Sequence, residues 1–157
     1  MEDEKPKAFT FEYSGIVKSL MTMCEVSRAH NPEFSPEPGP PSARRCLATW
    51  DTGAMVTVIS SEVVRDLCLV PTGKTIMYHA NGEACVNTYS VNILLPNNVV
   101  FSTLRVTEGK LNGTDVLIGM DIISMGDFSV TSSGNKTVLS FQYPSTHRVD
   151  YVGGLAI

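Results

Sequence analysis

Short runs of β-branched and aromatic residues, separated by turn-forming residues, dominate the hydrophobic pattern of this chain. Residues 9–26 contain "FTFEY" and "IVKSLMTMCEV", which alternate in part between apolar and polar positions and predict one or two strands. A further strand is expected over residues 45–50, "RCLATW", and another over residues 55–60, "MVTVIS". The first part of the chain is therefore predicted to be rich in strands.

The second part of the chain predicts three hairpins. The first turns at Asn81-Gly82, a dipeptide typical of two-residue hairpin loops. The second joins residues 89–95 to residues 99–107 through a turn in "LPNNVV", and the third turns at Gly134-Asn135. Between the last two, the apolar run "DVLIGMDIISMG" predicts a strand that breaks at Gly119 into a short helix.

Only one other segment has a helical pattern. Residues 60–69, "SSEVVRDLCL", place apolar side chains at helical spacing after Ser60 or Ser61, either of which suits an N-cap. The fold class expected is thus all-β, a closed or partly closed barrel with one or two short helices. The sequence shows no internal repeat.

A chain of 157 residues fits one domain with a real core. We expect a flexible N-terminus over 1–8, the barrel domain over 9–146, and a last strand or tail over 147–157. Within the domain, the density of prolines predicts a surface loop over 31–43, because proline can continue neither a β-ladder nor a helix.

Composition narrows the classes of function. The net charge is −4 and the basic residues are scattered, which argues against a nucleic-acid partner. No apolar run is long enough to cross a bilayer, and no secretory signal is recognisable, so we expect a cytoplasmic protein without a membrane partner. The four cysteines form no C-x-x-C pair and no histidine lies at zinc-like spacing, so they are expected to be reduced and partly buried, with no metal site.

The stretch "ATWDTGAMVTVIS", residues 48–60, places Asp51 inside an apolar run, where an unpaired charge is costly. A tight turn, with the Thr52 hydroxyl and the small Gly53, would hold this carboxylate rigid. Two carboxylates that share a proton can deprotonate water and protonate a carbonyl oxygen at the same time. The sequence holds one Asp-Thr-Gly, so the second carboxylate is expected from Asp51 of another copy across a two-fold axis.

These residues resemble the retropepsin-like (retroviral-type) aspartic peptidases, whose single lobes form homodimers. The motif "WDTGAMVTVIS" is similar to their active-site motif, "TIMYHANGEACVNTY" falls where they have a flap, and "DVLIGMD" resembles their second motif. The resemblance spans residues 44–143 and implies an aspartic endopeptidase without metal or cofactor, acting on peptides or unstructured proteins. It implies that Asp51, Thr52 and Gly53 are catalytic. The substrate-binding residues that it implies are Ala54, Tyr78, His79, Ala80, Asn81, Gly82, Glu83, Leu117 and Ile118.

The chain departs from the retroviral pattern on both sides of an ion pair. Acidic residues commonly follow the first motif and an arginine the second, whereas Met55, Val56 and Met120 stand here. We therefore expect apolar dimer contacts, with Met55 near Met120, and consider Arg65 with Asp121 as a substitute ion pair. Ala54 cannot hydrogen-bond the carboxylate as a serine could, so activity is expected from mildly acid to near neutral pH.

Two alternatives stay open. The domain could serve as a dimerisation or peptide-binding module with little turnover. The first 43 residues could be a cleavable extension of a zymogen, or "YSGIVKSLMTMCEV" could be an integral strand that pairs with "RCLATW". We favour the integral strand, because its apolar side chains would be hard to leave exposed.

Overall fold

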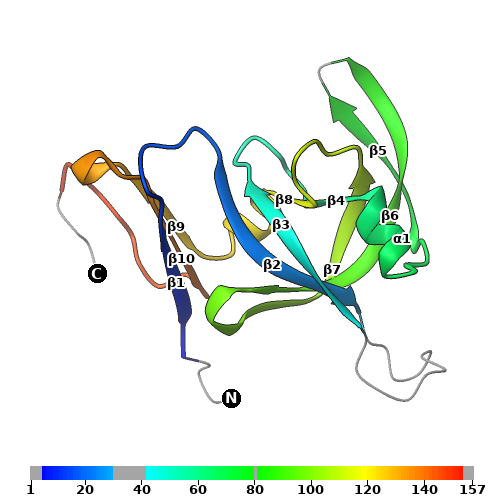
Figure 1. Cartoon of the computed structure of the whole chain (residues 1–157), viewed down its shortest axis with the longest axis horizontal. Coiled ribbons are helices and arrows are strands. Elements are labelled where there is room, and N and C mark those ends of the chain that lie inside the picture. The colour runs from blue at the N-terminus through cyan, green and yellow to red at the C-terminus, as the bar shows by residue number, and fades with distance from the viewer. Residues whose placement is uncertain (1–4, 30–41, 80, 154–157) are drawn as a thin grey trace.

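The computed structural model describes residues 5–29, 42–79 and 81–153, and strands dominate them (Figure 1). Two α-helices and two 3-10 turns interrupt the strands. The elements in chain order are β1 (Lys7–Glu12), β2 (Leu20–Arg28), β3 (Ala43–Trp50), β4 (Val58–Ser60), α1 (Ser61–Asp66), β5 (Gly73–His79), β6 (Gly82–Leu95), η1 (Pro96–Asn98), β7 (Val99–Gly109), β8 (Val116–Ile118), α2 (Met120–Ile123), β9 (Asp127–Thr131), η2 (Ser133–Asn135) and β10 (Val138–Tyr143).

The larger sheet closes into a barrel. Its strand order is β2-β3-β8-β4-β7-β6-β5, and β2 also pairs with β6, so that six strands form a ring and β5 extends from it. Alternate side chains of β2, β3 and β6 point inward, and Val26, Ala48, Val91 and Ile93 are fully buried. The all-β barrel with two short helices confirms the fold class expected from the sequence.

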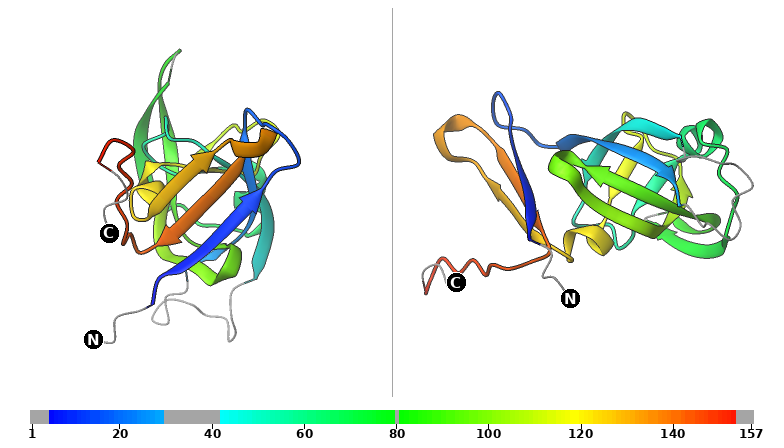
Figure 2. Two further views of the ribbon diagram at one scale, coloured as in Figure 1. Left: turned by 90° about the vertical axis from the view of Figure 1, so that its left-hand side faces the viewer. Right: turned by 90° about the horizontal axis from the view of Figure 1, so that it is seen from below.

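The smaller sheet, β1-β10-β9, stands beside the barrel (Figure 2). A cluster of aromatic rings joins the two sheets. Trp50, at the end of β3, stacks on Phe128 of β9 with ring centroids 5.5 Å apart, and it packs against Phe9 and Phe141 at 6.0 and 5.2 Å. This contact is important for the site, because Trp50 directly precedes Asp51.

The three predicted hairpins are confirmed by the ladders β5–β6, β6–β7 and β10–β9. The integral-strand interpretation of the N-terminal segment is also confirmed, since β2 pairs with β3 from Leu20↔Trp50 to Ser27↔Ala43. The predicted strand over 55–60 is too long, because only Val58–Ser60 pair and the preceding residues form a loop.

Helix α1 begins after Ser60, whose hydroxyl accepts a hydrogen bond from the Val63 amide at 3.3 Å and thereby caps the helix. Helix α2 follows Gly119, as the sequence predicts. Neither helix has the length or the apolar character that spanning a membrane requires, among the residues that are described.

Several boundaries differ from the expectation. Strand β1 begins at Lys7, inside the segment expected to be flexible, because Lys7 and Ala8 pair with Tyr143 and Gln142. Residues 144–153 form no strand beyond a single bridge at Arg148. Residues 31–41 of the predicted proline-rich loop (31–43) lie outside the described residues.

The cysteines are free, as expected, but their burial differs in pairs. Cys24 and Cys46 face each other across β2 and β3 and are buried, and burial raises the pKa of both thiols. Cys68 and Cys85 are exposed, so the expectation of partial burial is wrong for them.

Candidate active site

The candidate active site is the loop between β3 and β4, residues 51–57, at one end of the barrel (Figure 1). Asp51 is half-buried, and its Oδ1 accepts a hydrogen bond from the Gly53 amide at 2.8 Å. The Ala54 amide donates to the Asp51 carbonyl at 3.2 Å and closes a tight turn. A Cβ atom at Gly53 would lie 3.1 Å from Asp51 Oδ1, so the glycine leaves room for the carboxylate. The carboxylate is thereby held in place while Thr52 and Gly53 stay exposed.

The segment after β8 lies directly beneath this loop. Three backbone hydrogen bonds join them: Asp51 N to Ile118 O at 2.9 Å, Met120 N to Ala54 O at 2.8 Å, and Asp121 N to Met55 O at 3.2 Å. The contact is so close that a Cβ atom at Gly119 would lie 2.6 Å from the Val56 carbonyl carbon. Only glycine fits this crossing without a shift of the backbone.

The base of the loop is anchored in the core. Trp50 is 5% exposed, and its indole Nε1 donates to the Thr22 hydroxyl of β2 at 2.9 Å. The buried N–H therefore has a partner, and the large ring can pack fully against the aromatic cluster. Asp51 thus extends directly from one of the most constrained side chains of the protein.

The loop leaves two apolar side chains uncovered. Met55 is 78% exposed and Val56 is 41% exposed, while Met120 is half-buried on the segment below.

The predicted substitute pair of Arg65 with Asp121 is wrong. Arg65 lies 3.6 Å from Asp66 on its own helix, and the Asp121 carboxylate accepts hydrogen bonds from Thr57 instead.

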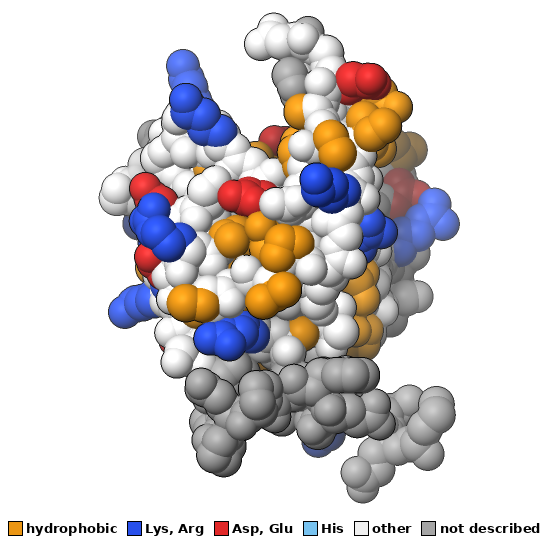
Figure 3. Space-filling model, turned by 90° about the vertical axis from the view of Figure 1, so that its right-hand side faces the viewer, with side chains coloured by type: hydrophobic (Ala, Val, Ile, Leu, Met, Phe, Trp, Pro, Cys, Tyr) orange, Lys and Arg blue, Asp and Glu red, His pale blue; other side chains and the backbone are white. Residues whose placement is uncertain are grey.

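The hairpin of β5 and β6 projects beyond the barrel at the same end as the loop (Figures 1 and 3). Its strands pair from Gly73↔Thr88 to His79↔Gly82. Gly82 has φ +125°, a conformation that L-residues avoid, so the turn depends on this glycine. Ile76 and Tyr78 lie on one face and are 53% and 71% exposed. The hairpin therefore presents apolar side chains to solvent.

The residues expected to bind substrate fall into separate groups. Ala54 lies in the loop with the expected catalytic residues Asp51, Thr52 and Gly53, and Leu117 of β8 pairs with Thr49 and Val58 on the strands that flank the loop. Ile118 is a correction: its side chain is fully buried in the barrel core, and only its carbonyl reaches the site, as acceptor for Asp51 N.

The remaining expected residues lie on the projecting hairpin. Tyr78 and Glu83 are cross-strand partners there, Asn81 lies in the turn, and Gly82, which was predicted to be a turn residue, begins β6 opposite His79. His79 joins the ladder through its backbone, whereas its side chain and all of Ala80 lie outside the described residues.

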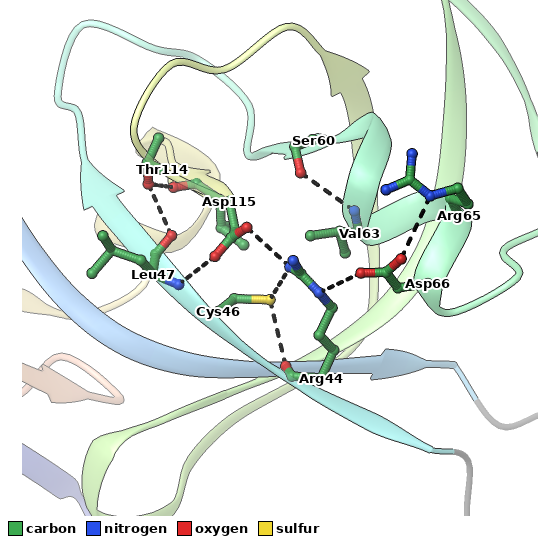
Figure 4. A network of polar contacts seen from close by, with 10 residues as sticks. Arg44, Cys46, Leu47, Ser60, Val63, Arg65, Asp66, Thr114 and Asp115 are labelled. Atoms are coloured by element: carbon green, nitrogen blue, oxygen red, sulfur yellow. Dashed lines mark hydrogen bonds and ion pairs between the residues drawn. The ribbon is translucent and has the colours of Figure 1, made fainter.

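A second polar network lies away from the loop (Figure 4). Arg44 of β3 contacts Asp115 Oδ1 and Asp66 Oδ2, each at 3.0 Å, and its Nη1 donates to Cys46 Sγ at 3.3 Å. Asp115 Oδ2 also accepts a hydrogen bond from Leu47 N at 2.8 Å. This network ties β3 to α1 and to the segment before β8, so these charges stabilise the fold.

Among the described residues, no group of three His, Cys, Asp or Glu side chains has an arrangement that could hold a metal ion. The chemistry available at the loop is that of a rigid, accessible carboxylate between a hydroxyl and exposed backbone. Sequence reasoning missed Thr57 beside it and considered Asp121 only as a partner of Arg65. The sequence signal for them is the spacing: Asp121 stands two residues after Gly119 of the second motif, and Thr57 stands six residues after Asp51.

A six-stranded barrel with an Asp-Thr-Gly loop above a glycine crossing defines a retropepsin-like aspartic protease fold. The family model described as "gag-polyprotein putative aspartyl protease" matches residues 43–125, more than half of the chain. The chain belongs to this family. The match includes the loop, the hairpin and the segment beneath the loop.

A solved structure has the same fold. A retropepsin-like aspartic protease from Rickettsia conorii aligns with a TM-score of 0.50 and 12% identity, over 90% of this chain and 98% of that one. The protease of a simian foamy virus aligns with a TM-score of 0.39 and 17% identity, over 51% of this chain and 81% of that one. No curated protein sequence matches the chain.

Proposed function

We propose that the chain is an aspartic endopeptidase that acts as a homodimer. The observation that carries the proposal is the Asp51 turn, in which the carboxylate accepts a hydrogen bond from the Gly53 amide and the Asp51 backbone amide donates to the Ile118 carbonyl below it. Membership of an aspartyl protease family supports the same chemistry. A turn that served only to reverse the chain would not need this close support.

The reaction needs two carboxylates of different protonation. One Asp51 is ionised and removes a proton from water, while Asp51 of the partner subunit is protonated and donates to the carbonyl oxygen of the peptide. The water attacks the carbonyl carbon directly, so no covalent intermediate with the protein forms. Two carboxyl groups at close range do not both ionise, because their negative charges repel each other, so the pair keeps one shared proton.

The partner is proposed to be a second copy because the sequence contains a single Asp-Thr-Gly. The exposed side chains of Met55 and Val56 beside Asp51 suit an apolar contact across the two-fold axis. In this arrangement the two Thr52 hydroxyls would brace the turns against each other. The active site and the dimer interface would then be one surface.

The β5–β6 hairpin is proposed to cover the bound peptide. Its exposed Ile76 and Tyr78 offer apolar surface, and closure over the substrate would exclude water. The substrates would be peptides or unstructured protein segments, which can lie extended between the loop and the hairpin.

The proposal is tested by cleavage of an unstructured protein and a peptide library, with and without a pepstatin-like inhibitor. The substitution Asp51→Asn should abolish cleavage, with a loss of at least about 1,000-fold, because both subunits of the homodimer lose the carboxylate of the dyad. The matched control is Asp66→Asn, which removes a carboxylate of the Arg44 network and should leave turnover in place. Sedimentation with the inhibitor should show a dimer.

Two results would decide against the enzyme. A strict monomer, with and without inhibitor, cannot form the dyad. Peptide binding that Asp51→Asn leaves unchanged, without cleavage by the wild type, would instead identify a peptide-binding module.

A further inference from the structure

Thr57 and Asp121 form the most closely bonded side-chain pair beside the candidate active site. Thr57 is the last residue of the 51–57 loop and is fully buried. Its amide donates to Asp121 Oδ2 at 2.8 Å, and its hydroxyl donates to Asp121 Oδ1 at 2.7 Å. The same hydroxyl accepts a hydrogen bond from Gly119 N at 3.2 Å. Loop, carboxylate and glycine crossing are thus joined through one threonine.

Asp121 holds the loop at a second point as well. Its own amide donates to the Met55 carbonyl at 3.2 Å, and its Oδ1 accepts from Ile122 N at 3.0 Å. Both carboxylate oxygens therefore accept hydrogen bonds from N–H or O–H donors. Such hydrogen bonds are stronger when the acceptor is charged. Nothing in this arrangement needs a substrate or a partner chain, so it is complete in the single chain.

We propose that Asp121 is a positioning residue that fixes the 51–57 loop and thereby orients the Asp51 carboxylate. The inference rests on the proposed protease function and adds a residue to it. Asp51 and Thr57 are the two ends of the loop: the first is bound to Ile118 O and the second to the Asp121 carboxylate. Without the carboxylate, the Thr57 end of the loop would lose two hydrogen bonds and keep the one from Thr107 N to its carbonyl. The loop would then be held less firmly, and the two carboxylates of the dyad would no longer meet at a fixed separation.

The chemistry requires a carboxylate at this position. An asparagine has one oxygen and one NH₂ group, so one of the two atoms that face Thr57 would become a donor. That NH₂ group would oppose the Thr57 amide at the Oδ2 position or the Ile122 amide at the Oδ1 position, and the segment would shift to relieve the contact. Asp121→Asn is therefore a change of nearly equal volume that breaks the hydrogen-bond pattern.

The experiment measures kcat and KM of Asp121→Asn on a cleavable peptide, together with the pH–rate profile. Misplacement of a catalytic group by about 1 Å costs about 100-fold in rate, so kcat should fall about 10- to 100-fold. KM should change less than threefold, because the substrate-contacting surface stays in place. The pH profile should shift, since the spacing of the two Asp51 carboxylates sets how they share a proton.

Two further variants separate positioning from stability. Asp115→Asn removes a half-buried carboxylate that accepts Leu47 N at 2.8 Å and pairs with Arg44, away from the loop. It should lower the melting temperature and leave kcat and the pH profile unchanged. Thr57→Ser keeps both donors to Asp121 and should retain a near wild-type kcat. Thr57→Val removes the hydroxyl and should lower kcat.

The outcomes are distinct. If the wild type cleaves the peptide and kcat of Asp121→Asn is within twofold of the wild-type value, the positioning role is overturned and the protease proposal stays intact. An equal loss of kcat in Asp115→Asn would show a general effect of stability and would also overturn the role. Absence of wild-type cleavage would overturn the protease function and the inference together. If Asp121→Asn does not fold, Thr57→Val against Thr57→Ser gives the same decision.

Discussion

The 51–57 loop and the β5–β6 hairpin lie at the same end of the molecule, yet they are built in opposite ways. The loop is bound from below by backbone hydrogen bonds to Ile118, Met120 and Asp121 and extends from a buried Trp50. The hairpin is held by its own ladder, and its exposed Ile76 and Tyr78 face solvent. One element is bonded to the core, whereas the other projects from the barrel (Figure 1).

This difference matches what a peptidase requires of each element. A carboxylate that must meet a partner at fixed separation gains from rigid support, whereas a cover must open for the substrate and close again. Elements with few buried contacts open at low free-energy cost, and elements packed on a core do not. The following predictions test the contrast from the largest expected effect to the smallest.

Gly119→Ala should have the largest effect. The new Cβ atom would lie 2.6 Å from the Val56 carbonyl carbon, so the loop or β8 must shift. We expect a loss of about 3 kcal/mol in the free energy of unfolding, measured by urea denaturation, and loss of peptidase activity. Gly15→Ala is the control, since nothing lies within 4 Å of a Cβ there. Equal stability of the two variants would contradict the close crossing.

Hydrogen exchange should separate the two elements directly. The amides of Asp51 and Met120, bonded to Ile118 O and Ala54 O, should exchange only through large openings. Amides of residues 75–78 should exchange through local opening that costs at least about 2 kcal/mol less. The measurement is amide exchange by NMR at neutral pH. Equal protection in both regions would remove the basis for a rigid site under a movable cover.

Gly82→Ala should act on the hairpin alone. At φ +125° an alanine is strained by about 1 kcal/mol, so the turn would rearrange while the barrel stays intact. We expect KM for a peptide to rise several-fold with little change in melting temperature. Gly134→Ala, at φ +67° in the β9–β10 turn, is the control and should leave KM unchanged. A raised KM in both variants would argue against a role for the hairpin.

The smallest effect is expected at Asp127, remote from both elements. Partial burial would raise the pKa of this carboxyl. Hydrogen bonds from Ser145, from the amides of Thr146 and His147 and from the His147 ring outweigh it and hold the pKa below the ordinary value of 3.8. A depressed pKa stabilises the fold above pH 3.8, and this contribution is lost as pH falls below that value.

Asp127→Asn tests this contribution. At pH 7 the substitution should lower the melting temperature by about 2 °C. The difference from the wild type should shrink as pH falls below 3.8, where the wild-type carboxyl takes up a proton. Thermal unfolding from pH 7 to pH 2.5 measures both. A constant difference over this range would contradict the assigned hydrogen bonds.

The hairpins and the helix cap could be predicted because their signals are local. Asn81-Gly82 and Gly134-Asn135 encode turns, and Ser60 caps α1 with a hydroxyl three residues from its donor. The strand expected over 55–60 failed for a nonlocal reason. Met55 and Val56 have the β-branched and apolar character of a strand, but their backbone carbonyls lie over Gly119 and α2, so they form a loop instead.

The sequence also predicted some residues of the candidate site and misplaced others. Asp51, Thr52 and Gly53 stand out because a carboxylate in an apolar run needs a structural reason. Ile118 was expected near substrate, although its position on β8 turns its side chain fully into the core. The sequence pattern of one strand of three residues does not tell which face is inside.

The sequence by itself determined the strand-rich class, the turn dipeptides and the presence of a single Asp-Thr-Gly turn. Only the tertiary structure decided that β2 also pairs with β6 and closes the barrel, and that Gly119 passes beneath the Asp51 loop. It also decided that Asp121 bonds to Thr57, 64 residues away, and not to Arg65. Local signals arise from the backbone preferences of neighbouring residues, whereas these contacts depend on strand order, which brings distant segments together.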